Sequence, residues 1–238
     1  MSSLTLVRHA QASFFAEHYD QLSPLGESQA RLLGEWWAER RVVPSEVYVG
    51  PRQRHRQTAA AVAAVYVRAG LPFPQPVELA DLDEYDLSGI LRILAPALAR
   101  ENEDFAVLHQ RQRHGASQRE QARSFQRMFE PLLVHWQAAA GLEGLESWAA
   151  FQLRIRRCLK QLAERPGRGR RILAFTSGGF IGAAAQWVLA APDRTALELN
   201  WRIHNTALTE FVFSGERITL DTFNSISHLP DPELATYR

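Results

Sequence analysis

The chain has 238 residues, of which 46% are hydrophobic and 22% are charged, and its formal net charge is +1. This is the composition of an ordinary globular protein, and the length suits one large domain. The near-zero charge argues against nucleic acid or a membrane surface as a partner, because the chain has no excess of positive charge to attract either of them.

The N-terminal segment predicts a strand followed by a helix. Leu4–Val7 is an apolar run of strand length, too short for a signal peptide and closed by the polar pair that follows it. Ser23-Pro24 predicts a helix start, because serine can cap the first turn and proline fits within it. The buried stripe of this helix is expected at Ala30, Leu33, Trp36 and Trp37.

A second strand and helix follow. Val47–Val49 is a short apolar run, and Thr58–Arg68 is rich in alanine and valine, which favours a helix packed on a sheet. Leu71–Pro76 contains three prolines and is expected to be an irregular connector.

The middle of the chain, about Leu87–Gly144, contains no convincing strand. Its stretch His109–Arg127 is dense in glutamine and arginine. The simpler interpretation is a solvated helical face, and the alternative is a helical cap whose arginines attract anionic substrates.

The C-terminal third returns to alternating helices and strands. Ser147–Leu162 is amphipathic and includes the single cysteine, Cys158, at a core position. One cysteine excludes an internal disulfide and a cysteine-based zinc site. Ile172–Phe175 is apolar throughout, as is typical of a central parallel strand, and Thr206–Phe213 with Arg217–Asn224 predicts a hairpin.

These elements predict an α/β fold, a three-layer α/β/α sandwich with a mostly parallel central sheet and a helical cap insertion at about residues 87–144. We expect one domain over residues 1–238. The apolar stretch Gly178–Ala191 is too short to span a bilayer, so we expect a cytoplasmic protein that binds neither nucleic acid nor membrane. The sequence does not define an oligomeric state.

Polar or glycine-rich motifs lie at the ends of three of the predicted strands. Arg8-His9 ends the first strand, Arg54 opens the helix after the second, and Thr176-Ser-Gly-Gly179 follows the central strand. Ligands bind at the carboxyl edge of open α/β sheets, so these side chains are expected to converge there. Arginine binds phosphate oxygens through a charged fork, imidazole can act as a nucleophile near neutral pH, and a helix start favours an anion.

Together with Leu82-Asp-Glu84, these motifs resemble the histidine phosphatase superfamily, also called the phosphoglycerate mutase-like family. The resemblance extends from Arg8-His9 to Asn205-Thr206. It implies that His9 attacks phosphorus to form a phosphohistidine, and that Arg8 and Arg54 hold the phosphoryl oxygens.

The same resemblance implies that Glu84 protonates the leaving oxygen and then activates water. Asp81, Asp83 and Asp86 are competitors in the same loop. If the Ser-Gly-Gly turn forms the phosphate pocket, the Ser177 hydroxyl and the Gly178 N–H are expected to contact phosphate. No acidic cluster with the character of a magnesium site accompanies the motifs, and two arginines can neutralise the phosphoryl charge, so the reaction is expected to need neither a metal nor another cofactor. The expected ligand is a small phosphorylated substrate or inorganic phosphate.

Two positions depart from the family pattern. Ala10 replaces the glycine that follows the nucleophile, a change that the turn is expected to tolerate. Ser177 stands where the family has a second pocket histidine. His204 or His55 could supply the missing imidazole, although each is more simply a surface or packing residue. Ser177→His is expected to raise turnover if the pocket has room.

Three functions remain open from the sequence. The first is a metal-independent phosphomonoesterase. A phosphoglycerate mutase is disfavoured because Gln11–Phe15 departs from the Glu-Ser-x-x-Asn pattern that follows the nucleophile in those mutases. A catalytically weak phosphate-binding protein is the third possibility, suggested by Ser177.

Overall fold

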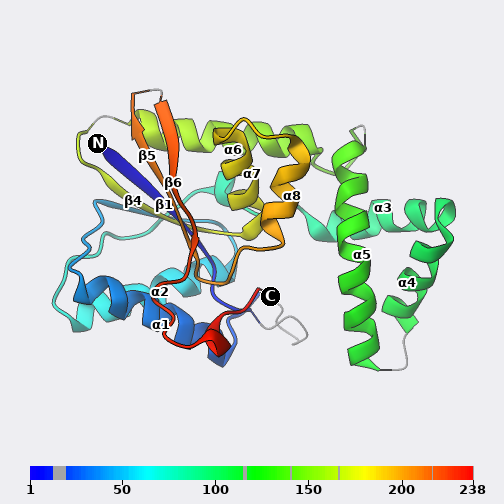
Figure 1. The fold of residues 1–238 in the computed structure, drawn as a ribbon, viewed down its shortest axis with the longest axis horizontal. Coiled ribbons are helices and arrows are strands. Elements are labelled where there is room, and N and C mark those ends of the chain that lie inside the picture. The colour runs from blue at the N-terminus through cyan, green and yellow to red at the C-terminus, as the bar shows by residue number, and fades with distance from the viewer. Residues whose placement is uncertain (13–19, 115–116, 140, 166, 216, 238) are drawn as a thin grey trace. The chain divides into compact units, whose positions relative to one another are not determined.

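A computed structural model describes residues 1–12, 20–114, 117–139, 141–165, 167–215 and 217–237. The chain divides into two compact units, which are described separately here. An α/β unit comprises Met1–Glu84 with Arg154–Arg238, and a second unit, Tyr85–Leu153, is inserted between these two segments of sequence (Figure 1).

One six-stranded sheet organises the α/β unit, in the order β3-β2-β4-β1-β5-β6. Neighbours from β3 to β1 pair in parallel, and only β5 runs against the others. The apolar strand predicted at Ile172–Phe175 lies between two parallel neighbours, as expected. The strands are β1 (Ser2–Arg8), β2 (Glu46–Val49), β3 (Val77–Glu78), β4 (Arg171–Thr176), β5 (Leu208–Ser214) and β6 (Arg217–Ser225).

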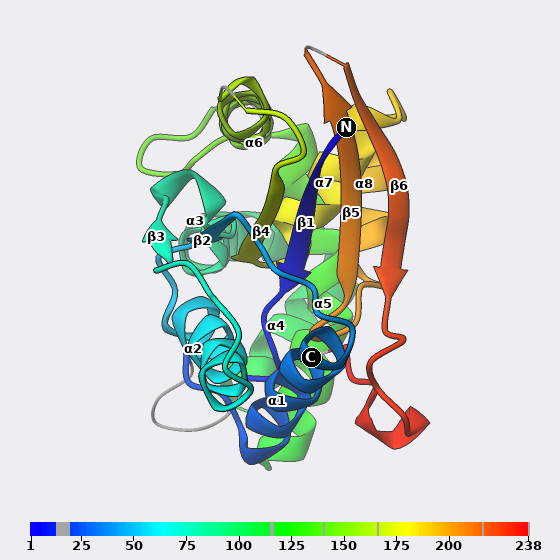
Figure 2. The same ribbon diagram turned by 90° about the vertical axis from the view of Figure 1, so that its left-hand side faces the viewer.

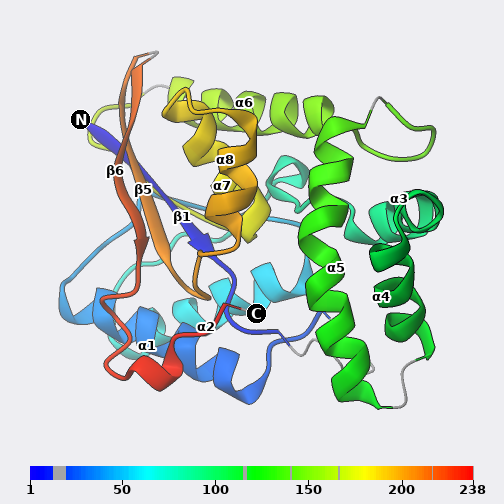
Figure 3. The ribbon, with the colours of Figure 1, turned by 45° about the vertical axis from the view of Figure 1, so that its right-hand side comes forward.

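Helices cover both faces of this sheet (Figures 2 and 3). On one face, α1 (Pro24–Glu39) and α2 (Gln53–Arg68) pack together and bury Leu33, Trp37 and Val62 against alternate strand residues such as Val7 and Phe175. On the other face lie α7 (Gly178–Val188) and α8 (Asp193–Asn200). Because successive strand side chains point to opposite faces, the central strands β1 and β4, which are buried almost throughout, contribute to both cores. The predicted α/β/α sandwich is confirmed.

The start of α1 follows the sequence prediction. Ser23 Oγ accepts a hydrogen bond from the Gly26 N–H, and Pro24 occupies the first turn. Trp37 is buried, but Trp36 is only half-buried, which corrects the expected stripe. Arg40 lies over the outer Trp36 ring, 4.4 Å from its centroid, so this tryptophan forms a boundary between core and solvent.

Helix α6 (Trp148–Glu164) confirms the amphipathic segment predicted before the central strand. Ser147 Oγ accepts from the Ala150 N–H at its start. Cys158 is buried, and burial raises the pKa of its thiol to about 12, as expected of a core cysteine.

Several boundaries differ from the sequence prediction. Helix α2 begins at Gln53, one residue before the start expected at Arg54. The hairpin strand β5 begins at Leu208 rather than at Thr206, because Thr206 has a φ of +59°, which is incompatible with a strand. Strand β3 has only two exposed residues, and α8 and the short 3₁₀ helices η1 (Ala80–Leu82) and η2 (Pro232–Leu234) carry too little periodicity to be predicted.

The inserted unit contains α3 (Leu87–Glu101), α4 (Glu103–His114), α5 (Gln118–Ala138) and the first residues of α6. Its described residues include no strand, as the sequence predicted. Trp136 is central to its core, with its ring 5.3 Å from that of Tyr85 and 5.7 Å from that of Phe151. The arginines at 111, 113, 123 and 127 are exposed, which confirms the solvated face for these positions; residues 115 and 116 lie outside the described chain.

A search of the described helices finds none that is long and apolar enough to cross a membrane.

Candidate active site

The candidate site lies where three neighbouring parallel strands end. The residues that follow β1 and β2 remain hydrogen-bonded to the end of β4. The His9 N–H donates to the Thr176 carbonyl and the Gly50 N–H donates to the Phe175 carbonyl, both at 2.9 Å. The residues that follow these strands therefore share one edge. This is the juxtaposition that the sequence predicts for the Arg8-His9, Arg54 and Ser177 motifs.

His9 is held by its backbone on two sides and is almost fully buried. The Asn205 side-chain amide donates to the His9 carbonyl at 3.0 Å, and the next backbone N–H, at Ala10, donates to Thr58 Oγ1 at 3.0 Å. Ala10 itself is buried with φ outside the left-handed region, so its Cβ brings no backbone strain. These two bonds fix the backbone that carries the imidazole.

The tautomer of His9 follows from one contact. Its Nδ1 lies 2.8 Å from the Ala10 carbonyl oxygen, which can only accept, so Nδ1 carries the proton. Nε2 then keeps its lone pair. Burial, followed by the nearby charges of Arg54 and Arg8, holds the pKa of His9 well below its usual value, so the ring is neutral near pH 7.

Two buried arginines stand beside this imidazole. Arg8 is 9% exposed and donates from Nη1 to the Ile203 carbonyl. Arg54 is 7% exposed, donates from Nη1 to Asp20 Oδ1 at 2.7 Å and lies 3.4 Å from Ser177 Oγ through Nη2. Two buried positive charges at one edge of the sheet favour an anionic ligand.

Ser177 and Gly178 form the turn from β4 into α7. Both are buried, and Ser177 is the N-cap residue although its side chain makes no capping bond. A Cβ added at Gly178 would lie 2.5 Å from Asn200 Oδ1 and 3.5 Å from Arg8 Nε, so a larger residue would require the Asn200 side chain to shift. The N-terminus of α7 thus lies beside the Arg8 guanidinium, and the partial positive charge of a helix N-terminus suits an anion.

Of the two histidines that the sequence offers in place of the second pocket histidine, His55 is the one in contact with Ser177. This residue lies in the first turn of α2, is fully buried and places Nε2 2.7 Å from Ser177 Oγ. Its ring centroid is 5.8 Å from that of His9. His204, the other candidate, instead stacks on Tyr237 with centroids 4.1 Å apart. Burial and the charge of Arg54 hold the pKa of His55 well below its usual value.

The four carboxylates of the loop near Glu84 separate by their contacts. Glu84 Oε2 accepts from the Gly179 N–H at 3.1 Å, which places this carboxylate at the start of α7. Asp83 pairs with Arg52 at 2.5 Å and Asp81 pairs with Arg157 at 2.7 Å. Asp86 caps α3. Of the four, Glu84 is the one in contact with the turn that carries Ser177 and Gly178.

Some residues of this site carry no strong sequence signal. Asp20 binds both Arg54 and the Gln53 N–H at 2.6 Å, and so connects the segment before α1 to the start of α2. Thr58 Oγ1 donates to the Arg54 carbonyl at 2.7 Å while accepting from Ala10. An aspartate in a connector or a threonine in a helix can have many other roles, so neither residue could be assigned to the site from the sequence. Residues 13–15 of the segment that disfavours a mutase lie outside the described chain.

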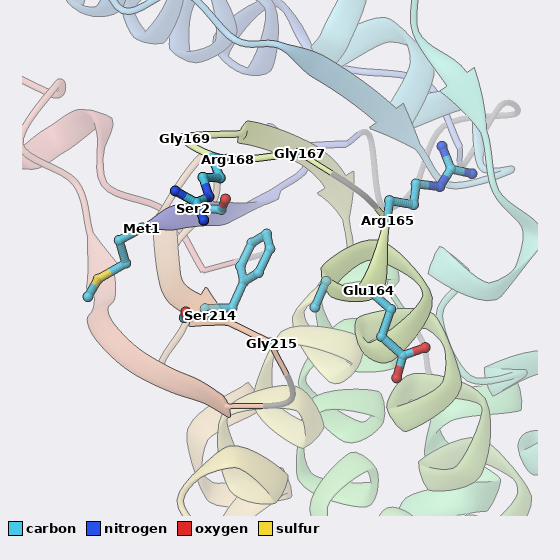
Figure 4. Close-up of a pocket in the computed structure, with 11 residues that line it drawn as sticks. Met1, Ser2, Glu164, Arg165, Gly167, Arg168, Gly169, Ser214 and Gly215 are labelled. Atoms are coloured by element: carbon cyan, nitrogen blue, oxygen red, sulfur yellow. The ribbon is translucent and has the colours of Figure 1, made fainter.

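A cavity of about 690 Å³ lies at the other end of the sheet and contains none of these residues (Figure 4). It is lined by the start of β1, the loop around Arg168 and the turn at Ser214-Gly215. Elsewhere, the described residues contain no group of three or more His, Cys, Asp or Glu side chains arranged to hold a metal ion.

The family model described as the histidine phosphatase superfamily (branch 1) matches residues 4–136 and 112–226. No sequence among the curated proteins matches the chain.

Several solved structures have a similar fold. YhfR from Bacillus stearothermophilus is 18% identical, with 96% of this chain and 99% of that chain covered and a TM-score of 0.64. A putative alpha-ribazole-5'-P phosphatase from Escherichia coli is 16% identical over 94% and 98%, with a TM-score of 0.63. Phosphoserine phosphatase from Entamoeba histolytica, in complex with 3-phosphoglyceric acid, is 16% identical over 96% and 99%, with a TM-score of 0.61. At these identities the likeness shows the fold.

Proposed function

Because the chain belongs to the histidine phosphatase superfamily (branch 1), we propose that it is a metal-independent phosphomonoester hydrolase that acts through a phosphohistidine intermediate. The observation that carries this proposal is the environment of His9. A neutral imidazole, with its Nδ1 proton on the Ala10 carbonyl, lies beside two buried arginines. Its remaining lone pair is available for attack.

In the first step His9 Nε2 attacks phosphorus. The N–P bond forms as the bond from phosphorus to the leaving oxygen breaks, and the protonated Glu84 carboxyl donates its proton to that oxygen. The Ala10 carbonyl stabilises the positive charge that develops on the ring through its bond to Nδ1–H. Arg8 and Arg54 neutralise the phosphoryl oxygens, and positioning with charge neutralisation is the main requirement of phosphoryl transfer.

In the second step Glu84, now a carboxylate, removes a proton from water. The water oxygen bonds to phosphorus, the N–P bond breaks and its electron pair returns to Nε2. One carboxyl group thus serves as acid and then as base. Its contact with the Gly179 N–H supports this role, because it fixes Glu84 next to the turn where phosphate is proposed to bind.

We propose a small phosphorylated metabolite as the substrate. Similar structures were solved with phosphoserine and with 3-phosphoglyceric acid, which supports this size and charge class. The inserted unit is proposed to act as a cap that influences substrate choice. Its arginines are exposed, so they would act by long-range attraction that salt screens.

The test of this function is a panel of phosphomonoesters assayed with wild type and His9→Ala. Hydrolysis of several small esters by wild type, and none above background by the variant, is the expected result. Incubation with 2- and 3-phosphoglycerate distinguishes the mutase alternative, because a mutase interconverts them while a phosphatase releases phosphate. If wild type neither hydrolyses any ester nor binds vanadate, the hydrolase proposal fails; binding of phosphate or vanadate without turnover would support the weak binder suggested by Ser177.

Metal independence is tested in the same assay. Two guanidinium groups can neutralise the phosphoryl charge, so activity is expected to survive prolonged treatment with a chelator. Loss of activity that magnesium or manganese restores would contradict this part of the proposal.

A further inference from the structure

One fully buried titratable side chain at this edge has no part in the proposed mechanism. His55 follows Arg54 in the first turn of α2, yet its Nε2 lies 2.7 Å from Ser177 Oγ, at the end of β4. The two residues come from elements that are more than a hundred positions apart in the sequence. Their contact therefore depends on the fold and not on local chain geometry.

The backbone leaves space for this ring. A Cβ added at Gly50 would lie 2.4 Å from His55 Nδ1 and 2.8 Å from the Leu82 carbonyl oxygen, so only glycine at this position accommodates the imidazole. Ser177, at the opposite side of the ring, has a short side chain and is itself fully buried. The imidazole of His55, which comes from α2, therefore lies between Gly50 and Ser177.

The hydroxyl of Ser177 meets two nitrogen atoms. Arg54 Nη2 is an obligate donor and lies 3.4 Å from Oγ, and His55 Nε2 is the closer neighbour. A hydroxyl has one proton to donate and two lone pairs that accept. The ring can bond to Oγ in either tautomer, as donor or as acceptor. In the tautomer with the proton on Nε2, Arg54 and His55 both donate to Oγ, and the hydroxyl proton is directed to a third partner.

We propose that His55 is a positioning residue that carries its proton on Nε2. It thereby fixes the Ser177 hydroxyl so that it donates to a phosphoryl oxygen, and Ser177 and His55 act as one unit. This inference rests on the proposed phosphatase function. A serine alone is a freely rotating neutral donor, whereas a serine held by a buried imidazole is oriented before the substrate arrives. Preorganised donors of this kind contribute most in a site that excludes water.

The first test separates hydrogen bonding from packing with two variants of similar size. His55→Gln retains a donor near the Nε2 position, and His55→Leu fills the space without one. His55→Leu is expected to lower kcat/KM about tenfold, the size of one neutral hydrogen bond, while His55→Gln stays within about threefold of wild type. Arg56→Ala, an exposed neighbour on α2, serves as the control and is expected to match wild type. Equal activity of the leucine and glutamine variants would overturn the proposal.

The second test is a double-mutant cycle with Ser177→Ala. If the two residues act as one unit, His55→Leu combined with Ser177→Ala loses about tenfold, the same as either single variant. Independent contributions would multiply to about a hundredfold and would contradict the proposal. Circular dichroism and thermal unfolding of each variant identify any loss that arises from misfolding, and vanadate affinity of the folded variants must follow the same coupling.

The third test moves the imidazole. Ser177→His alone is expected to lower activity, because His55 already occupies the adjoining space, whereas Ser177→His with His55→Ala is expected to be at least tenfold more active than that single variant. This replaces the expectation from sequence that Ser177→His raises turnover. Full activity of Ser177→His with His55 in place would overturn the account. An inactive wild type that also fails to bind vanadate would instead refute the phosphatase function itself.

Discussion

The arginines at the sheet edge and those of the inserted helices have the same chemistry and opposite environments. Arg8 and Arg54 are at most 9% exposed and lower the pKa of a neighbouring histidine. Arg123 and Arg127, on α5, are exposed and lie around a shallow cavity that also contains Glu120. The number of arginines in a segment therefore says little about where an anion binds.

Burial explains the contrast. An exposed guanidinium keeps its hydration and its field is screened within about 10 Å at ordinary salt. A buried one loses hydration and must recover that free energy from partners, which for Arg54 include Asp20. A phosphoryl group binds most favourably where it replaces the water lost by buried positive charges. Mutation of a buried arginine should therefore lower activity much more than mutation of an exposed one.

Removing one arginine from each region is the strongest way to test this comparison. Arg54→Ala is expected to lower kcat/KM by about 10²–10³, as for the loss of one preorganised donor to transition-state charge. Arg123→Ala is expected to stay within about twofold at 0.15 M salt, because its charge is screened. Steady-state kinetics on p-nitrophenyl phosphate at two salt concentrations measures both. Comparable losses in the two variants would show that burial is the wrong criterion.

Within the loop that leads to the insertion, Glu84 and Asp81 allow the same kind of comparison for carboxylates. Glu84→Gln is expected to slow alkyl phosphates by about 10²-fold, since general acid catalysis contributes about 10²–10⁴. p-Nitrophenyl phosphate should be affected much less, because its leaving group hardly needs a proton. Asp81→Asn is the matched control, since Asp81 pairs with Arg157 instead. Equal slowing of both substrates by Glu84→Gln would assign the proton transfer to another residue.

The smallest expected effect concerns a buried histidine behind the site. His228 Nε2 lies 2.8 Å from Thr206 Oγ1, whose own proton goes to the Asn205 carbonyl, so His228 donates here. Burial lowers the pKa of His228 to about 4. The unfolded chain takes up this proton near pH 6.5 and the folded chain does not, so stability is lost as the pH falls from 6.5 towards 4.

Over the interval from pH 7 to pH 5 this linkage amounts to about 2 kcal/mol of unfolding free energy. His228→Gln keeps a donor for Thr206 without a titrating ring and is expected to reduce the pH dependence by that amount. Urea unfolding at several pH values measures it. An unchanged slope in the variant would indicate that His228 titrates normally in the folded protein.

The sequence predicted the parts of the fold and site that depend on local pattern. Apolar runs predicted the central strand, Ser23-Pro24 predicted the start of α1, and the ends of parallel strands predicted that Arg8, His9 and Arg54 would share an edge. Strand length and helix capping act over a few residues, and the shared edge follows from the rule that parallel strands end on the same side of a sheet.

What could not be predicted depends on side-chain packing between distant elements. The contact between His55 and Ser177 requires the first turn of α2 to face the end of β4, and it also requires glycine at position 50. The association of Asp20 with Arg54 depends on the path of a connector. A histidine next to an arginine in sequence has many possible orientations, and only the assembled sheet selects one.

The central claim is that His9 is the covalent site, and rapid acid-free quenching of enzyme mixed with a ³²P-labelled phosphomonoester tests it most directly. We expect a labelled protein whose label is stable in alkali and labile in acid, maps to the peptide that contains His9, and is absent from His9→Ala. His55→Gln, the matched histidine control, should retain the label. Full labelling of His9→Ala, or an acid-stable label on another residue, would contradict the account.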